Sequence, residues 1–272
     1  MHAGSAHNAQ HAKQGHHAQY ILHLADNALV HGQRIAQWCS HGPVLEEDIA
    51  MANIGLDHIG QARMLYQHGA NLLGNTTEDK LAYFRDPEQF LNYTLLELPH
   101  RTALAPSAQT QMDYAVTIAR NFLAASWMNL VWAQLQSSSD LQLAAIAAKS
   151  AKEVRYHLRH STDWMLRLGD GTAQSHARMQ AALDYLMPYT QEFFIPCTME
   201  TAALQSHIGA DVAALQTPWK ASVASVITQA TLQMPVSKGY VSRGKEGQHS
   251  EHLSYLLAEM QSLARAHPEA TR

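Results

Sequence analysis

Two segments of the sequence combine acidic and histidine side chains at helical spacing. They are NIGLDHIGQAR, around residue 57, and AKEVRYHLRHS, around residue 157. Carboxylates and imidazoles are suitable ligands for iron and manganese, and a Glu-x-x-His pair projects both ligands from one helix face into a bundle core. The two segments contain Asp57-x-x-Gly60 and Val154-x-x-His157, so each lacks one member of the pair. His58 lies about 100° round the helix from Asp57 and does not replace the missing ligand.

We regard Asp57, Gly60, Val154 and His157 as vestigial site positions. Two further features of the sequence decide whether they are expected to bind a metal. Glu153 lies four residues before His157, and this spacing still places both on one face, which favours a site. Against it, the segment between Asp113 and Asp140 contains no Asp, Glu or His. One wall of a four-helix cage then has no anionic or imidazole donor. We therefore predict no metal-binding, cofactor-binding or catalytic residue in this chain.

The same side chains have a second interpretation as a buried polar network. Lysine, glutamate and histidine follow one another at a spacing of four residues along the second segment, and the lysine places a positive charge where a cation would otherwise bind. Buried charges need such partners because an unpaired one is costly. We expect the network to consist of Asp26, Asp57, Lys149, Glu153 and His157.

The elements that must position these residues are helices. Apolar residues recur with a period near 3.6 along most of the chain, which predicts helices over residues 18–38, 45–73, 110–136 and 141–168. Four long helices with a long connection between the second and third are typical of a ferritin-like bundle. Shorter helices are expected over residues 86–98, 174–187, 198–207, 217–232 and 250–266, with a loop at 235–248. Phe122, Trp127 and Trp132 are expected in the core.

The predicted fold class is therefore all-α, a ferritin-like four-helix bundle with additional C-terminal helices. Residues 18–272 are expected to form one domain, because no linker long enough to divide it is present. Residues 1–17 are rich in His, Ala, Gln and Gly and lack large apolar side chains. We expect them to form a disordered His-rich tail.

Composition limits the classes of function. The net charge is -4 and no run of Lys and Arg occurs, so a nucleic-acid partner is not expected. No apolar run is long enough to span a membrane, and the two cysteines, Cys39 and Cys197, fit a reducing cytoplasm. Charged residues make up only 15% of the chain. This low share indicates that a partner covers part of the surface, because interfaces are depleted in charge.

Four stretches together make the sequence resemble the C-subunit family of bacterial phenylacetyl-CoA ring epoxidases, which are multicomponent monooxygenases of aerobic phenylacetate catabolism. The stretches are LADNALVHGQRIAQWC, NIGLDHIGQAR, AKEVRYHLRHS and SEHLSYLLAEMQSL, and the resemblance extends over residues 19–267. It implies a structural, non-catalytic subunit without a cofactor of its own. The implied partner is a related di-iron catalytic subunit, in a heterodimer or higher hetero-oligomer, together with further oxygenase components and a reductase.

Two alternatives remain open from the sequence. The chain is a di-iron or manganese carboxylate oxidase if unusual ligands such as Asp57, Glu153 and His157 hold metal. It is a CoA-ester binding module if the basic residues Lys238 and Lys245, with Arg243 between them, hold phosphates.

Overall fold

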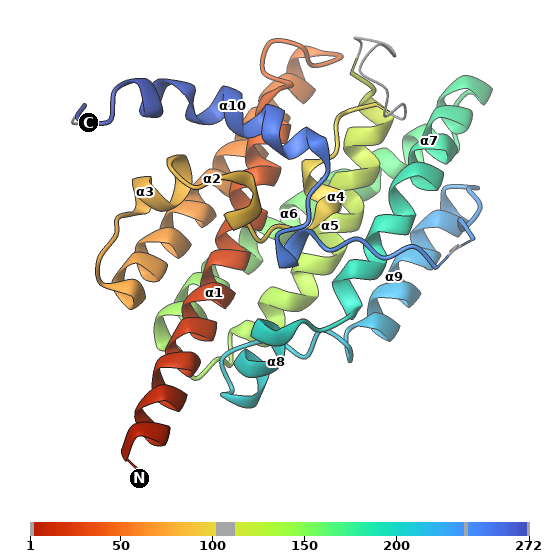
Figure 1. Cartoon of the computed structure of the whole chain (residues 1–272). Helices are drawn as coiled ribbons and strands as arrows, with labels where there is room; N and C mark the ends of the chain where they lie inside the picture. Colours follow the sequence, from red (N-terminus) through yellow and green to blue (C-terminus); the bar gives the residue numbers. More distant parts are fainter. Residues whose placement is uncertain (1–2, 102–111, 237–238, 271–272) are drawn as a thin grey trace.

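The computed structural model describes residues 3–101, 112–236 and 239–270, with side chains from residue 15 onward. Four long helices form a bundle in which α1 packs along α2 and α5 packs along α6 (Figure 1). They are α1 (Ala3–Ala36), α2 (Leu45–Leu73), α5 (Tyr114–Leu135) and α6 (Leu141–Gly169). The described residues form no β-strand, and their one β-bridge joins Arg243 and Gln248. The predicted all-α, ferritin-like fold is confirmed.

Local sequence signals determine where the long helices begin and end. Gly74 ends α2 in the left-handed conformation, with φ 76°, which glycine adopts without steric cost. Asp140 caps α6 by accepting hydrogen bonds from the amides of Gln142 and Leu143. These boundaries therefore follow closely those predicted from the sequence.

The start of α1 differs from the prediction. The helix begins at Ala3 and continues without interruption to Ala36, whereas we expected a disordered tail through residue 17 and a helix from residue 18. The segment is rich in alanine, which has the highest helix propensity. His17 also contacts Asp140 at the start of α6, and this long-range contact has no local signal in the sequence.

The long connection between α2 and α5 also differs from expectation. It contains α3 (Glu78–Tyr83), the 3-10 turn η1 (Pro87–Gln89) and the short α4 (Thr94–Glu97), not one helix over residues 86–98. Side chains of α1 explain the interruption. The amide of Leu91 donates to Asp26, and the amide of Tyr93 donates to Asn27. These amides are therefore used by α1 and not by a local helix.

The C-terminal elements cover the outside of the bundle. α7 packs on α5, α8 packs on α1, α9 packs on α5 and α6, and α10 crosses α3 and α4 (Figure 1). These elements are α7 (Ala173–Leu186), the 3-10 segment η2 (Met187–Phe194), α8 (Thr198–Gln205), α9 (Gln216–Gln229), the 3-10 turn η3 (Gly244–Glu246) and α10 (Glu251–Ala266).

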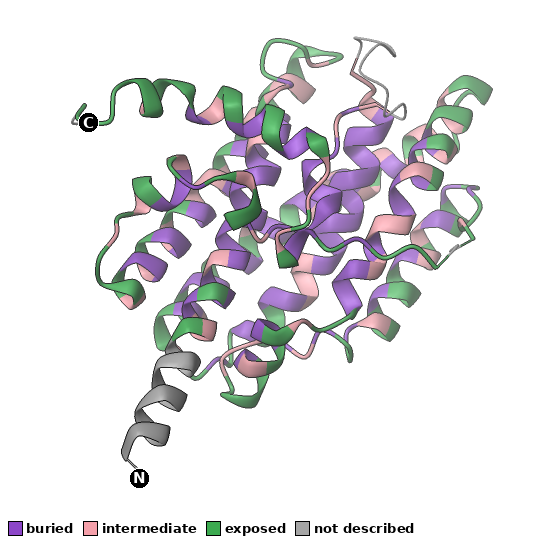
Figure 2. Cartoon of the chain, in the orientation of Figure 1, coloured by how far each residue is buried: buried purple, intermediate pink, exposed green. Residues whose placement is uncertain are grey.

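The core is centred on α5. Most residues of this helix are buried, since α4, α6, α7 and α9 all pack against it (Figure 2). Phe122, Trp127 and Trp132 are fully buried, as predicted. Among the residues described, no helix combines the length and the apolar character needed to cross a membrane.

Candidate functional site

The four long helices meet at a small cavity inside the bundle. In ferritin-like proteins, metal ligands project inward from facing helices at such a position. The cavity has a volume of about 10 Å³, close to the space that one water molecule occupies. Its lining residues are His31 of α1, Ile54 and His58 of α2, Asn121, Ala124, Ala125 and Met128 of α5, and Val154 and His157 of α6.

Three imidazole rings form a row beside this cavity. The ring centroids of His31 and His58 are 4.5 Å apart, and those of His58 and His157 are 5.0 Å apart. All three side chains are buried. Burial, together with the nearby charge of Arg120, lowers the pKa of His31 to about 3, and burial lowers the pKa of His58 well below its usual value. The rings of His31 and His58 are therefore neutral at pH 7.

The wall formed by α5 provides neither a carboxylate nor an imidazole. It contributes alkyl groups, the thioether of Met128 and the amide of Asn121. The Oδ1 atom of Asn121 already accepts a hydrogen bond from Nε2 of His31 at 2.9 Å. This wall therefore stabilises an imidazole of α1 and leaves no anionic group to bind a cation.

A buried cation lies close to the same wall. Arg120 is fully buried, donates to the carbonyl of Leu98, and lies with its Nη2 2.6 Å from Nδ1 of His100. Burial and the neighbouring charge of Arg34 lower the pKa of Arg120 to about 9, so its guanidinium still carries a charge at pH 7. This positive charge disfavours a metal cation nearby.

The acidic residues of the predicted network lie at the edge between α2 and α6. Oδ2 of Asp57 is 2.9 Å from Nε2 of His157, and the Asp57 side chain is 39% exposed. Oε2 of Glu153 accepts a hydrogen bond from Gln61 at 2.9 Å. The Lys149 ammonium lies 3.9 Å from Glu153 and is 60% exposed. The structure brings these residues into neighbouring pairs, but the lysine is not the buried charge that we expected.

The face of α2 that points inward is not the one expected from the motif. His58 and Gln61 are buried and line the interior, whereas a side chain added at Gly60 would meet only open space. Asp57 therefore belongs to the outer edge together with Gly60. The sequence contained the signal for this register, because the buried residues of α2 follow a 3.6-residue period through Met51, Ile54, His58, Gln61 and Leu65.

Asp26 does not join this network, contrary to the prediction. It is fully buried, forms an ion pair with Arg85, and accepts hydrogen bonds from the Tyr66 hydroxyl at 2.5 Å and the Leu91 amide at 2.8 Å. Burial alone would lower the pKa of Arg85, but the Asp26 carboxylate raises it above its usual value. Asp26 lies five residues before His31, about 140° round the helix, so it faces a different neighbour.

The side chains around the first cavity determine whether a pair of irons fits the bundle. A ferritin-like di-iron centre takes one carboxylate from each of the four helices and one histidine from each of two. The cavity offers imidazoles, an amide and alkyl groups. Among the residues that the structure describes, the cavity contains no three His, Cys, Asp or Glu donors close enough to share one ion. The side chains present therefore do not fit a di-iron centre.

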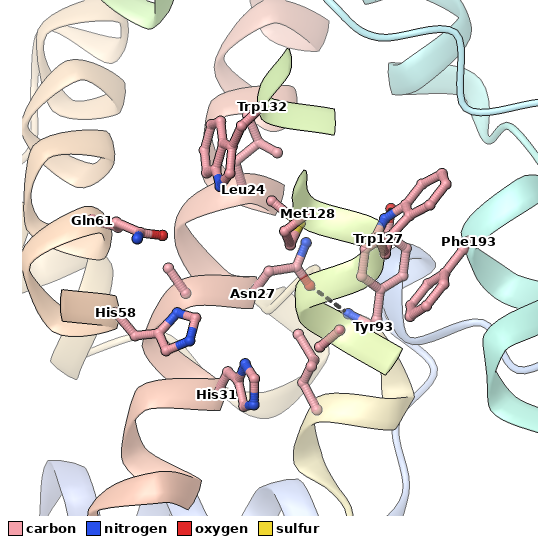
Figure 3. Close-up of a pocket in the computed structure, with 13 residues that line it drawn as sticks. Leu24, Asn27, His31, His58, Gln61, Tyr93, Trp127, Met128, Trp132 and Phe193 are labelled. Atoms are coloured by element: carbon pink, nitrogen blue, oxygen red, sulfur yellow. Dashed lines mark hydrogen bonds between the residues drawn. The ribbon is translucent and has the colours of Figure 1, made fainter. Parts of the chain in front are cut away.

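A second cavity adjoins the first and is mainly apolar (Figure 3). Trp127 stacks on Phe193 with ring centroids 5.2 Å apart, and its indole N–H donates to the Tyr93 hydroxyl. The cavity volume is about 20 Å³. An engineered cavity that binds benzene measures about 150 Å³. These two cavities are therefore each too small for an aromatic ring in this conformation.

The basic loop predicted as an alternative phosphate site is only partly available. Lys238 lies outside the described residues, and Arg243 is exposed. Lys245 is buried, with its ammonium 2.7 Å from the Glu200 carboxylate and 2.7 Å from the Ile195 carbonyl oxygen. This lysine therefore holds the loop on the bundle and is not free to bind a phosphate.

Comparison with known proteins agrees with the architecture. Residues 1–271 match the family described as phenylacetic acid catabolic protein. The C subunit of the 1,2-phenylacetyl-CoA epoxidase of Escherichia coli (strain K12) is 43% identical over 249 residues, which cover 92% of this chain and 96% of that protein. This chain therefore belongs to the phenylacetic acid catabolic protein family.

Proposed function

We propose that this chain is a structural, non-catalytic subunit of a phenylacetyl-CoA ring epoxidase, and that it supports a related di-iron catalytic subunit. The similarity to a protein named as the C subunit of such an epoxidase supports the complex. One structural observation carries the division of roles. Among the residues that the structure describes, those lining the cavity between the four long helices include no carboxylate.

The charge balance of the interior supports the same proposal. Carboxylates in a di-iron protein offset the charge of the metal, and an uncompensated buried charge is costly. Here His31 and His58 are neutral, and the nearby Arg120 is a cation. Iron in this cavity would add positive charge, and none of the described residues that line it is a carboxylate that could balance that charge. We therefore assign the di-iron cofactor to the partner subunit and none to this chain.

The surface offers a place for that partner. Leu45, Ile49 and Leu56 are exposed on one side of α2, because positions separated by four and eleven residues fall on nearly the same helix face. Tyr156 of α6 is also exposed, next to His157 in the sequence. We propose that the catalytic subunit covers this face, in a heterodimer or higher hetero-oligomer. The complex would also contain further oxygenase components, and a reductase would supply electrons to the partner's metal.

Metal analysis tests the proposal. The chain is purified alone and with its catalytic subunit, and both samples are loaded with ferrous iron and passed over a desalting column. We expect the di-iron content and its oxo-bridge absorption only in the sample that contains the partner. A pair of irons with that absorption in the isolated chain would support the oxidase alternative, in which Asp57, Glu153 and His157 are ligands. Calorimetry with phenylacetyl-CoA on the isolated chain tests the CoA-ester alternative.

A further inference from the structure

Three side chains from separate parts of the sequence converge at a position away from the central cavity. Nε2 of His17 and Nε2 of His68 lie 2.7 Å and 2.6 Å from the same oxygen, Oδ2 of Asp140. His17 belongs to α1, His68 to α2, and Asp140 directly precedes α6. Within the described part of the chain, this is the one group of three or more His, Cys, Asp or Glu donors whose ligand atoms all lie within 4.8 Å of one another.

The carboxylate of this cluster is held in place by the helix that it caps. Oδ1 of Asp140 accepts hydrogen bonds from the amides of Gln142 and Leu143, both at 3.0 Å. Only Oδ2 then faces the two imidazoles. Such supporting hydrogen bonds orient a metal ligand and are a common part of metal sites.

The electrostatics of the cluster favour an ionised carboxylate in a sheltered place. Partial burial would raise the pKa of Asp140, but hydrogen bonds from His17 and His68 and from the Leu143 amide lower it well below its usual range. The side chains of Asp140, His68 and His17 are 7%, 10% and 20% exposed. The site is therefore shielded but still open to solvent on the side of α1.

We propose that His17, His68 and Asp140 bind a zinc ion. Two imidazole nitrogens and one carboxylate oxygen are a ligand set that zinc accepts, with water completing a tetrahedron. Magnesium and calcium prefer oxygen ligands and do not match two imidazoles. The ligand atoms are now separated by hydrogen-bond distances. Tetrahedral ligands at about 2.0–2.2 Å from zinc lie roughly 3.3–3.6 Å from one another, so binding requires each imidazole nitrogen to move away from Oδ2 by roughly 0.7 Å.

This zinc site would clamp one end of the bundle and is separate from the vestigial di-iron positions. His68 lies ten residues after His58 on α2, which corresponds to about 15 Å along the helix. Binding would join α1, α2 and the start of α6. In the sequence, Asp140 follows His17 by 123 residues and His68 by 72 residues. Because zinc binds the folded state, it would raise the stability of the chain.

The test must separate this site from the other histidines, because the chain has 18 histidines in total, His17 and His68 included. The parent for the experiment is the full chain with His2, His7, His11 and His16 replaced by Gln. Zinc chloride is titrated in competition with a chromophoric chelator, and thermal unfolding is followed with and without zinc. We expect one equivalent of bound zinc and a zinc-dependent rise in melting temperature.

Two variants of that parent decide the assignment. His68→Gln removes one imidazole, and Asp140→Asn removes the charge while keeping a good helix cap. Each should weaken zinc binding by at least about tenfold and abolish the rise in melting temperature, with unchanged helix content by circular dichroism. The proposal is wrong if the parent binds no zinc, or if either variant binds zinc as tightly as the parent. In both cases the cluster would be a hydrogen-bonded clamp without metal.

Discussion

At the scale of single residues, Lys245 and Glu200 form a buried ion pair that no pattern in the sequence indicates. The Lys245 ammonium and the Glu200 carboxylate are 2.7 Å apart, and both side chains are almost fully buried. The Cys197 amide also donates to Glu200. Removing one partner of such a pair leaves an uncompensated charge in a low-dielectric interior. The pair therefore links the loop before α10 to the start of α8.

Replacement of Lys245 tests the structural role of this pair. Lys245→Met should destabilise the chain by about 3–5 kcal/mol in urea denaturation, because Glu200 is left buried without its ammonium. The double variant Lys245→Met with Glu200→Gln should recover a large part of that loss. If the single variant instead keeps its stability and loses affinity for phenylacetyl-CoA, the lysine is a phosphate ligand.

The buried histidines predict how stability depends on pH. Burial lowers the pKa of His31 to about 3, and lowers those of His58 and His100 well below their usual value. Unfolded histidines titrate near pH 6.5. Below that pH the histidines of the unfolded chain bind protons, whereas the buried imidazoles of the folded chain stay neutral. The free energy of unfolding therefore falls as the pH falls from about 6.5 toward the pKa of the folded state. Each such imidazole contributes a slope of about 1.4 kcal/mol per pH unit.

His58→Leu isolates one of these contributions. Urea denaturation between pH 4.5 and 6 measures how the free energy of unfolding rises with pH. In His58→Leu this slope should be smaller by about 1.4 kcal/mol per pH unit than in the parent chain. Met128→Leu is the matched control, since it changes the same cavity without removing a titrating group. An unchanged slope in His58→Leu would mean that His58 is protonated in the folded state.

At the scale of elements, a close approach between α6 and α9 depends on a glycine. A Cβ added at Gly169 would lie 2.4 Å from the Ala230 carbonyl oxygen and 2.8 Å from the Ala230 Cβ. The end of α6 therefore rests directly on the end of α9, with no room for a side chain. Gly60 on α2 is the opposite case, because a Cβ there would meet nothing within 4 Å.

Replacement of glycine by alanine should therefore have opposite effects on the free energy of unfolding at Gly169 and Gly60. Gly169→Ala should lower the free energy of unfolding by about 1–3 kcal/mol because the helices must separate. Gly60→Ala should raise it by about 0.5–1 kcal/mol because alanine restricts the unfolded chain and favours the helix. The midpoint of chemical denaturation of each isolated variant measures both effects. Equal effects of the two substitutions would contradict the packing described for α6 and α9.

At the scale of the whole molecule, exposed apolar side chains on α2 mark the face on which we place the catalytic subunit. Leu56 is 68% exposed in the isolated chain. Leu56→Glu should weaken association with the catalytic subunit about tenfold or more, because a carboxylate is then buried at the interface without a partner. Leu263→Glu on α10 is the control, with a leucine that is 73% exposed on another element.

Size-exclusion co-elution and titration calorimetry measure this association. Both variants should keep the fold of the isolated chain, since neither leucine belongs to the core. If Leu263→Glu disrupts the complex and Leu56→Glu does not, the partner covers a different face of the molecule.

Local patterns in the sequence predict the helical segments and show that the third long helix carries no acidic or imidazole ligand for a metal. Both properties are local. The apolar period along residues 114–135 predicts a buried helix, and that same stretch contains no acid or histidine. Caps such as Asp140 and Gly74 are also local signals, so the end of α2 and the start of α6 were predictable, whereas the start of α1 at Ala3 was not.

The rotation of each helix about its axis, and the distant residues that meet as a result, depend on long-range packing. Asp57 and His58 are adjacent in sequence, and packing of α2 against α1 places the histidine inside and the aspartate at the edge. The three ligands His17, His68 and Asp140 come together for the same reason, although no spacing in the sequence relates them. A small rotation of a helix about its axis changes the face that is buried, and long-range packing energy fixes that rotation.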